Sequence, residues 1–386
     1  MRYNAAMSDG MITWAEIDLD AIGFNMRSFR RAVGAGVVIY AVVKANAYGH
    51  GAIPVTQAAL QAGADRVAVH RLVEGLALRE AGIEAPVLIM GYTPPEAVGA
   101  IVSKRLTPSV ISLEFARLLS QQAQVAGVQV PVHIKVDTGM SRYGIMPSAV
   151  LNFSQELLRL PGIFLEGLFT HFATADWLDQ SFTLQQLEAF NLVLTELREA
   201  GIDIPMVHAA NSAALARRPE ALFNAVRPGI SLYGLQPSTE WSAPFDLRPA
   251  LTLKSRLSRV TDLPAGSAVS YGRTYIASHA IRAALVPVGY GDGYPRALSN
   301  RGVVLVQGQR AAVIGRVCMD QFVIDVSDIP DVRQDDEVVL IGKQGDEEIT
   351  VQELADLAGT IQNEIIASLS ARVVRVYLRA GKPEPT

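Results

Sequence analysis

Short apolar segments alternate with longer amphipathic ones from about Asp18 to Leu235, and this alternation restricts the possible folds more than any other feature. Eight segments rich in β-branched residues are predicted as strands, at residues 37–45, 66–69, 86–90, 106–111, 130–136, 165–171, 205–210 and 224–231. Between them, apolar residues recur at three- and four-residue spacing, which predicts helices at 20–32, 57–62, 73–81, 96–102, 113–126, 149–159 and 184–200. About eight strand–helix repeats in roughly 200 residues are typical of a (β/α)8 TIM-like barrel. The alternative is a doubly wound open sheet, but such sheets usually carry a glycine-rich first turn, which residues 44–47 do not provide.

The pattern changes after Leu235, where residues 236–244 form a polar, proline-containing linker candidate. Strand-like runs follow at 250–260, 281–288, 302–306, 310–317, 322–326, 337–341 and 373–378, with short helical patterns at 351–358 and 362–368. We therefore predict an α/β chain with an N-terminal barrel domain at 14–243 and a mostly antiparallel β domain at 244–380. Residues 1–13, together with the strand-like run 11–17, are expected to associate with the second domain.

Composition excludes several classes of protein. The formal net charge is −4 and charges of both signs are interspersed, so no basic stripe indicates nucleic-acid binding. No apolar run reaches the roughly 18 residues of a membrane-spanning helix, and the N-terminus lacks the features of a secretory signal. Cys318 is the single cysteine, which excludes an internal disulfide, and no metal site is expected. We expect a cytoplasmic protein in which Cys318 is a buried structural thiol rather than a nucleophile.

Lys44 follows the apolar run of the first predicted strand. Burial disfavours the ammonium form and lowers the pKa of a lysine, which makes its amine nucleophilic enough to form a Schiff base. A strand-end lysine that reaches solvent fits this stretch equally well.

Other polar residues follow the later predicted strands, at the barrel end where functional groups collect. Arg142 follows the fifth strand, His171 ends the sixth and Ser212 follows the seventh. Loops after strands seven and eight often bind phosphate in this fold, and Ser212 with the N–H groups of Gly229 and Ile230 could do so. Ser212 is also a candidate helix N-cap, a role compatible with phosphate binding.

Seven segments occur in a fixed order along the chain: AVVKANAYGHG (41–51), VDTGMSRYG (136–144), LFTHFA (168–173), HAANS (208–212), VRPGISLYG (226–234), VSYG (269–272) and RVCMDQ (316–321). Together they resemble the pyridoxal-phosphate-dependent alanine racemases, from about Trp14 to Tyr377. The resemblance implies a homodimeric isomerase that interconverts L- and D-alanine and supplies D-alanine for cell-wall peptidoglycan.

The resemblance also assigns roles in binding pyridoxal 5'-phosphate. Lys44 would hold it covalently, and Tyr48, Ser212, Gly229 and Ile230 would contact its phosphate. His171 would pack against its ring, and Arg227 would bond to its pyridine nitrogen. An arginine there keeps that nitrogen unprotonated, which favours return of a proton to Cα over transamination.

Two opposed bases are the simplest way to racemise an amino acid. By resemblance, Lys44 serves one face of Cα and Tyr271 of the partner subunit serves the other, which requires a two-fold dimer with composite sites. A phenol needs nearby cations or donors to act as a base, and we expect His208 to hydrogen-bond Tyr271, with Arg227 as a further candidate.

The substrate residues are also inferred by resemblance. Arg142 would bind the substrate carboxylate, because a guanidinium suits bidentate contact with it. Lys135 resembles a lysine that many members carry carbamylated. The backbone of Met319 would line the pocket, with Asp320 next to it as a supporting residue. Tyr294, Arg316 and Asp176 resemble residues of the entrance to this pocket.

Three alternatives remain at this stage. By resemblance we expect a tyrosine directly before Arg372, but this chain has Ala371, which would leave room for a larger substrate such as serine. A serine or broad-specificity racemase is therefore the closest alternative. Arg227 argues against a decarboxylase or aldolase on the same barrel, because a carboxylate would be expected at its position in such an enzyme. Tyr271 and the second domain argue against a non-catalytic cofactor carrier.

Overall fold

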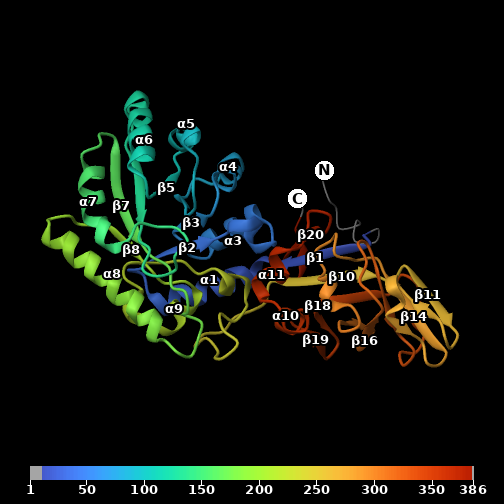
Figure 1. Ribbon diagram of the computed structural model, residues 1–386. Helices are drawn as coiled ribbons and strands as arrows, with labels where there is room; N and C mark the ends of the chain where they lie inside the picture. Colours follow the sequence, from blue (N-terminus) through green and yellow to red (C-terminus); the bar gives the residue numbers. More distant parts are fainter. Residues whose placement is uncertain (1–10, 385–386) are drawn as a thin grey trace. The chain divides into compact units, whose positions relative to one another are not determined.

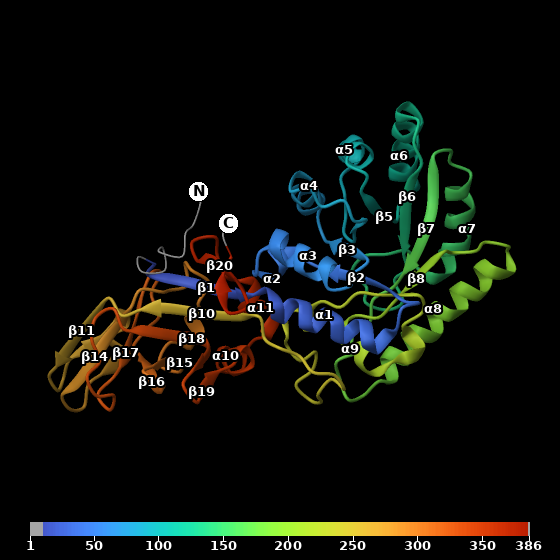
Figure 2. The same cartoon turned by 180° about the vertical axis from the view of Figure 1, so that it is seen from behind.

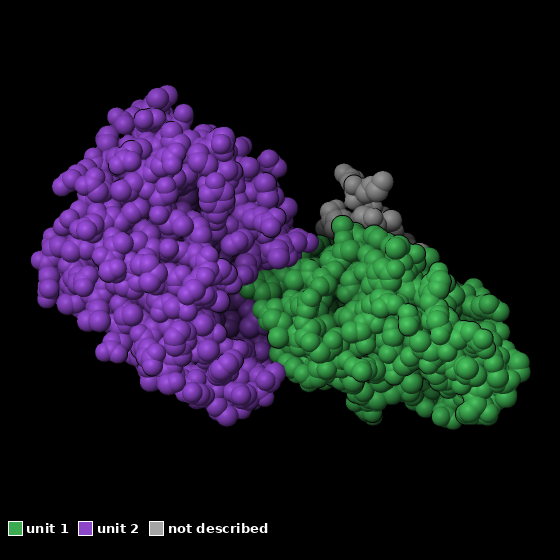
Figure 3. All heavy atoms as spheres, in the orientation of Figure 1, with its two compact units in different colours: residues 1–20, 48–51, 249–386 green, residues 21–47, 52–248 purple. Residues whose placement is uncertain are grey.

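A computed structural model describes residues 11–384, which form two compact units (Figure 3). The barrel unit comprises Ala21–Ala47 and Ala52–Arg248, and the β-rich unit comprises Tyr48–Gly51 together with the described residues up to Asp20 and from Pro249. Residues 14–20, which we predicted in the barrel domain, therefore group with the β-rich unit. Our prediction for residues 1–10 lies outside the described residues.

Eight parallel strands close the barrel in sequence order (Figure 1), which confirms the predicted fold class over the open sheet. Closure is made by the pair of the first and last strands, with Val38 opposite Ala225. The strands are β2 (Val38–Val42), β3 (Arg66–Val69), β4 (Val87–Ile89), β5 (Thr107–Val110), β6 (Val130–Lys135), β7 (Ile163–Phe169), β8 (Met206–His208) and β9 (Ala225–Val226).

Helices lie outside these strands, as Figures 1 and 2 show. They are α1 (Leu19–Val33), α3 (Ala52–Gln61), α4 (Leu72–Glu80), α5 (Val98–Ser103), α6 (Leu113–Ala126), α7 (Pro147–Leu158), α8 (Ser181–Glu199) and α9 (Ser212–Arg217). Local sequence explains their ends: the Ser112 side chain caps the start of α6, and Gly127 ends it at φ +65°. No helix among residues 11–384 is long and apolar enough to cross a membrane.

The β-rich unit is built on one large sheet, in the order β11-β14-β17-β16-β15-β18-β10-β1-β20-β21 with β19 paired to β18. Its pairs are antiparallel except β1 with β20. The strands are β1 (Thr13–Asp18), β10 (Leu251–Arg256), β11 (Arg259–Leu263), β14 (Ile281–Val286), β15 (Val303–Val306), β16 (Gln309–Ile314), β17 (Phe322–Asp325), β18 (Glu337–Gln344), β19 (Glu347–Ile349), β20 (Val374–Arg379) and β21 (Lys382–Pro383).

Smaller elements complete this unit: the hairpin of β12 (Ala268–Val269) and β13 (Tyr275–Ile276), and the helices α10 (Val351–Ala358) and α11 (Gln362–Ala367). The predicted pairing of the first strand with this unit is confirmed, because β1 lies between β10 and β20. The predicted strand at 250–260 is in fact two strands. Its backbone changes partner at the break, where the Leu257 N–H bonds to Asp336 and the Ser258 N–H bonds to Leu285.

Candidate active site

Lys44 begins a left-handed turn at the C-terminal end of the first barrel strand. The turn is α2 (Lys44–Tyr48), in which Ala45, Asn46 and Ala47 have φ between +52° and +54°. Such a conformation costs about 1–2 kcal/mol for each L-residue other than glycine, asparagine or aspartate. The Ala47 N–H closes the turn on the Val43 carbonyl at 2.8 Å. Sequence periodicity did not predict this turn, because none of its five residues is a glycine.

The Lys44 ammonium is half-buried among charged groups. Burial lowers its pKa, Arg142 lowers the pKa further and Glu74 raises it. Tyr48 ends the same turn but belongs to the β-rich unit, where burial raises the pKa of its phenol to about 12. Contact between Tyr48 and a cofactor phosphate remains a prediction.

Arg227 directly follows β9 and is only 3% exposed. Its guanidinium donates from Nη1 to His208 Nδ1 at 2.6 Å, and from Nη2 to the carbonyls of Thr170 at 2.7 Å and Ala209 at 3.1 Å. Burial lowers the pKa of Arg227 to about 10, so the group stays cationic at neutral pH. These acceptors fix the direction in which its remaining N–H groups can point.

A directional hydrogen-bond chain continues from Arg227 through the barrel interior. Because Arg227 can only donate, His208 Nδ1 must accept, which leaves the proton of a neutral His208 on Nε2. His208 Nε2 then donates to His133 Nδ1 at 2.8 Å, and His133 Nε2 donates to Glu166 Oε2 at 3.0 Å. Both oxygens of Glu166 also accept from Arg66 at 2.9 Å. The barrel core is therefore crossed by a polar chain with a cation at each end.

This row of hydrogen bonds contradicts the prediction that His208 bonds Tyr271. Both ring nitrogens of His208 are occupied inside the barrel, so His208 has no nitrogen left to bond Tyr271. Its ring is fully buried and stacks on Phe169, with centroids 4.8 Å apart. His171 is half-buried, and its Nδ1 lies 3.4 Å from Arg227 Nη2. Burial and then Arg227 hold the pKa of His171 well below its usual value.

Ser212 lies at the start of α9, but it is not the helix cap that we considered. The Asn211 side chain caps α9 by accepting from the Ala214 N–H at 3.0 Å. The Ser212 hydroxyl instead accepts from the N–H groups of Gly229 at 2.9 Å and Ser231 at 3.3 Å. The Ser231 hydroxyl, which is also buried, has no hydrogen-bond partner within residues 11–384. Ile230 begins the short helix η4 (Ile230–Tyr233). The hydroxyls of Ser212 and Ser231 and the N–H of Ile230 are donors that fit an anionic group such as a phosphate.

Lys135 ends β6 and is 6% exposed. Burial, followed by Arg142 and Arg227, lowers the pKa of its amine to about 8. Its Nζ lies 5.5 Å from the ring centroid of Tyr143. Arg142 itself is exposed on the loop after β6, where Asp137 accepts from the N–H groups of Gly139 and Ser141. Lys135 thus lies in a mostly cationic setting, in which Asp137 raises the pKa of its amine and Arg142, Arg227 and Lys44 lower it.

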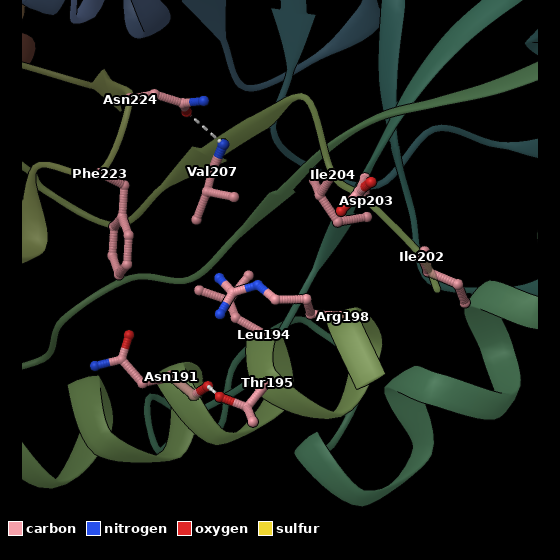
Figure 4. Close-up of a pocket in the computed structure, with 10 residues that line it drawn as sticks. All are labelled: Asn191, Leu194, Thr195, Arg198, Ile202, Asp203, Ile204, Val207, Phe223 and Asn224. Carbon is pink, nitrogen blue, oxygen red and sulfur yellow. Dashed lines mark hydrogen bonds between the residues drawn. The ribbon is translucent and has the colours of Figure 1, made fainter. Parts of the chain in front are cut away.

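A cavity of about 460 Å³ lies elsewhere in the barrel unit, beside α8 and the segments that lead into β8 and β9 (Figure 4). Arg198, Asp203 and Phe223 help to line it, and the Asn224 side chain accepts from the Val207 N–H at its edge. It adjoins the N-terminal ends of these strands, whereas Lys44, His171 and Arg227 follow C-terminal ends. None of the predicted site residues lines this cavity, so we do not assign it to the active site.

In the β-rich unit, Tyr271 lies at the tip of the β12–β13 hairpin and is 75% exposed. The hairpin tip is held by Ser270, whose hydroxyl donates to the Arg316 carbonyl at 2.7 Å. Met319 is 53% exposed, and its carbonyl accepts from the Gly291 N–H. A Cβ at Gly289 would lie 2.2 Å from that carbonyl, so only glycine permits this approach. The geometry thus presents a phenol and a methionine on exposed loops.

Asp320 is paired with Arg372 at 2.8 Å, and Arg372 also reaches Asp292 at 3.3 Å. Ala371 beside it is exposed on the loop between α11 and β20, so the structure gives no support for a pocket-narrowing role at that position.

The entrance prediction for Tyr294 is wrong for this chain. Tyr294 is 2% exposed and stacks on Phe322, whereas Tyr290 in the same loop is 44% exposed. Asp176 has a structural role here, because its carbonyl accepts from Trp241 Nε1 in the predicted linker at 2.8 Å.

Sequence reasoning missed four charged or titratable residues near the predicted groups: Arg66, Glu74, His133 and Glu166. Two of them carried a usable signal, because a histidine at 133 and a glutamate at 166 interrupt apolar runs predicted to be buried strands.

Comparison with known proteins matches two family models to this chain. The model described as "Alanine racemase, N-terminal domain" matches residues 17–237, and "Alanine racemase, C-terminal domain" matches residues 250–377. An alanine racemase of Carboxydothermus hydrogenoformans is 48% identical over 366 residues, which cover 95% of this chain and 99% of that one. One from Methanococcus maripaludis is 44% identical over 367 residues, which cover 95% of this chain and 98% of that one.

Solved structures agree with this match. Alanine racemase from Bacillus anthracis with bound L-Ala-P superposes with a TM-score of 0.91 at 41% identity, covering 97% of each chain. Alanine racemase from Clostridium difficile 630 superposes with a TM-score of 0.93 at 38% identity, covering 98% of each chain.

Proposed function

Because this chain belongs to the alanine racemase family, and is by that membership an amino-acid racemase, we propose that it interconverts L- and D-alanine with pyridoxal 5'-phosphate held at Lys44. The observation that carries this proposal is the set of cations and donors at one end of the barrel. Lys44, Arg227 and Ser212 each follow a C-terminal strand end, and the pKa of Lys44 is lowered there by burial. Bound pyridoxal phosphate would supply an electron-withdrawing ring that acidifies the Cα–H bond of an attached amino acid.

The barrel residues have separable roles in this proposal. Lys44 Nζ is the covalent attachment point. Ser212 donates its hydroxyl hydrogen to the phosphate while its oxygen accepts from the Gly229 N–H, and the N–H of Ile230 and the residue Tyr48 lie at the same phosphate. Arg227 donates to the ring nitrogen, and its three acceptors keep it in place. Since its pKa of about 10 leaves it protonated, Arg227 does not remove or supply a proton at neutral pH.

Proton transfer at Cα needs one base on each face. Lys44 would act on one face and Tyr271 of the partner subunit on the other, in a homodimer with two composite sites. The exposure of Tyr271 supports this assignment, as does the exposure of Tyr290 and Met319 on other loops of the same unit. Large apolar side chains on loops that carry a family motif indicate a surface that another chain covers.

Arg142 would bind the substrate carboxylate, with Met319 at the pocket wall and Asp320 as a supporting residue. Lys135 supports Arg142 if its amine reacts with carbon dioxide to form a carbamate and release one proton. That reaction requires the neutral amine, and a pKa of about 8 keeps a fraction of Lys135 neutral at physiological pH. The product would be an anion beside the exposed Arg142, in place of a second cation.

A serine or broad-specificity racemase is the alternative function. Supply of D-alanine for peptidoglycan and a cytoplasmic location are also proposed on family membership alone. Rescue of a bacterial strain that depends on added D-alanine would test the supply role.

Two measurements test the activity. The purified protein should show the visible absorption band of lysine-bound cofactor, and Lys44→Ala should abolish it while the exposed-lysine control Lys343→Ala retains it. In D2O, L-alanine should exchange its Cα hydrogen for deuterium as it loses optical activity. Release of carbon dioxide would indicate a decarboxylase. Bound cofactor without hydrogen exchange would indicate a non-catalytic carrier. Equal rates on serine and alanine would indicate a racemase of broader specificity.

A further inference from the structure

Glu74 connects the start of helix α4 to the turn that begins at Lys44. Its Oε2 accepts from the N–H groups of His70 and Arg71, both at 2.8 Å. Its Oε1 accepts from the N–H of Ala45 at 2.6 Å. One carboxylate therefore receives three backbone N–H groups from two segments, and one of them belongs to the residue directly after Lys44.

A helix cap explains only part of this arrangement. Glu74 is the third residue of α4, and a glutamate at this position commonly bonds back to the backbone that precedes the helix. The bonds from Oε2 satisfy that role completely. The bond from Oε1 leaves the helix and reaches the strand end of β2, so it serves the Lys44 turn.

The Lys44 turn needs such an acceptor. From Ala45 to Tyr48 four successive residues have positive φ, which is unfavourable for residues with a Cβ. The Ala47 N–H bonds to Val43 and the Asn46 side chain accepts from the Ala52 N–H at 2.9 Å, so the middle and end of the turn are tied locally. Glu74 holds Ala45, the first of the four residues with positive φ. Because Ala45 directly follows Lys44, its backbone helps to set the direction of the Lys44 side chain.

The charge of Glu74 also matters, because the groups around Lys44 are mostly cationic. Titratable or charged groups that interact with Lys44 come from several barrel segments, namely Arg142, Lys135, His70, His171 and Glu74. Among these five, Glu74 is the one acid. Its carboxylate opposes the effect of Arg142 on Lys44.

We propose that Glu74 is a positioning residue for Lys44, which fixes the left-handed turn by its bond to Ala45 and balances the surrounding cations by its charge. The inference rests on the proposed role of Lys44 as the cofactor attachment point. Glu74 touches neither substrate nor cofactor in this account; it acts through the backbone and field at Lys44.

Two variants separate geometry from charge. Glu74→Gln keeps the length of the side chain but removes the charge and places an N–H2 group among donors. Glu74→Asp keeps the charge but is too short to reach both Ala45 and the α4 cap. Glu80→Gln, at the exposed end of the same helix, is the matched control.

Two readouts are measured on the full chain. The first is the pH at which Lys44 in cofactor-free protein is half-maximally acetylated, followed by mass spectrometry. The second is the rate at which added pyridoxal phosphate becomes attached at Lys44, followed by absorbance. For Glu74→Gln we expect a lower acetylation midpoint and attachment about tenfold slower or more. For Glu74→Asp we expect a midpoint near that of the parent protein with attachment still slowed, and for Glu80→Gln no change in either.

A folded Glu74→Gln protein with the parent's midpoint and attachment rate would overturn the inference. If Glu74→Gln fails to fold, Glu74→Asp decides, since a parent-like attachment rate in that variant removes the positioning role. Failure of the parent protein to attach cofactor at Lys44 would refute the proposed function. The acetylation midpoints of cofactor-free protein would still test Glu74 in that case.

Discussion

Single residues in this barrel are constrained by charge as much as by packing. TIM-barrel interiors are usually filled by branched apolar side chains, but here Arg227, His208, His133 and Glu166 form a hydrogen-bonded row inside the barrel. Buried charges are costly unless every member of such a row is bonded. Removing either histidine therefore takes a bonding partner from both of its neighbours in the row, and the effect on stability should be large.

Replacement of His208 by alanine tests this dependence. It removes the acceptor of Arg227 Nη1 and the donor to His133 Nδ1, so two buried groups lose a partner. We expect the free energy of unfolding to fall by about 2–4 kcal/mol. Urea unfolding measures this loss, and His279→Ala on the exposed surface is the control, with an expected change near zero. Equal stability of both variants would show that the row contributes little.

The buried histidines also predict how stability depends on pH. Burial is the largest cause that lowers the pKa values of His133, His171 and His208 in the folded chain. Between the folded and unfolded pKa values the unfolded state binds more protons, so stability rises with pH there. The stability that the neutral histidines contribute is complete above the histidine pKa of the unfolded chain, about 6.5, and is lost as pH falls below that value. Urea midpoints should therefore drop from pH 7 to pH 5, and unchanged midpoints over that range would contradict the assigned neutral histidines.

At the scale of elements, the turn α2 departs most from the backbone conformations that its residues prefer, because four successive residues without glycine have positive φ. Ala45 is exposed there, so its substitution changes backbone strain with little effect on packing. Its small neighbours Asn46 and Ala47 make the positive φ values tolerable, because a β-branched side chain in this region is a genuine outlier.

Replacement of Ala45 by valine should lower the free energy of unfolding by about 1–2 kcal/mol. Ala45→Gly accepts positive φ without strain and should be close to neutral, since its gain is offset by a more flexible unfolded chain. Chemical denaturation of the two variants gives the comparison. If valine proves as well tolerated as glycine, the left-handed turn is not present in solution.

Sequence patterns predicted the regular elements well and the site geometry only in part. Helices α6 and α10 have the predicted bounds, and all eight barrel strands lie within or close to predicted runs, because apolar periodicity reports burial directly. The predicted strand at 224–231 is reduced to Ala225–Val226, since Gly229 leads into η4. The role of Glu74 and the occupancy of both His208 nitrogens depend on contacts between distant segments, which no local pattern encodes.

At the scale of the whole molecule, the central claim is that Lys44 and Tyr271 act together although they belong to different units of the chain. We propose that the pair is completed between two subunits, with Lys44 of one chain and Tyr271 of the partner subunit at each site. Each chain then contributes one base to each of two sites in an isologous dimer. Lys44→Ala and Tyr271→Phe should each inactivate the homodimer.

Subunit mixing tests this claim most directly. Lys44→Ala and Tyr271→Phe chains, each inactive alone, are unfolded together in equal amounts and refolded with cofactor. A mixed dimer has one site with both substitutions and one site with both native bases. Random pairing should therefore restore about a quarter of the parent's racemase activity. If mass spectrometry shows mixed dimers and the activity stays at the sum of the two inactive parents, the two bases do not meet across subunits.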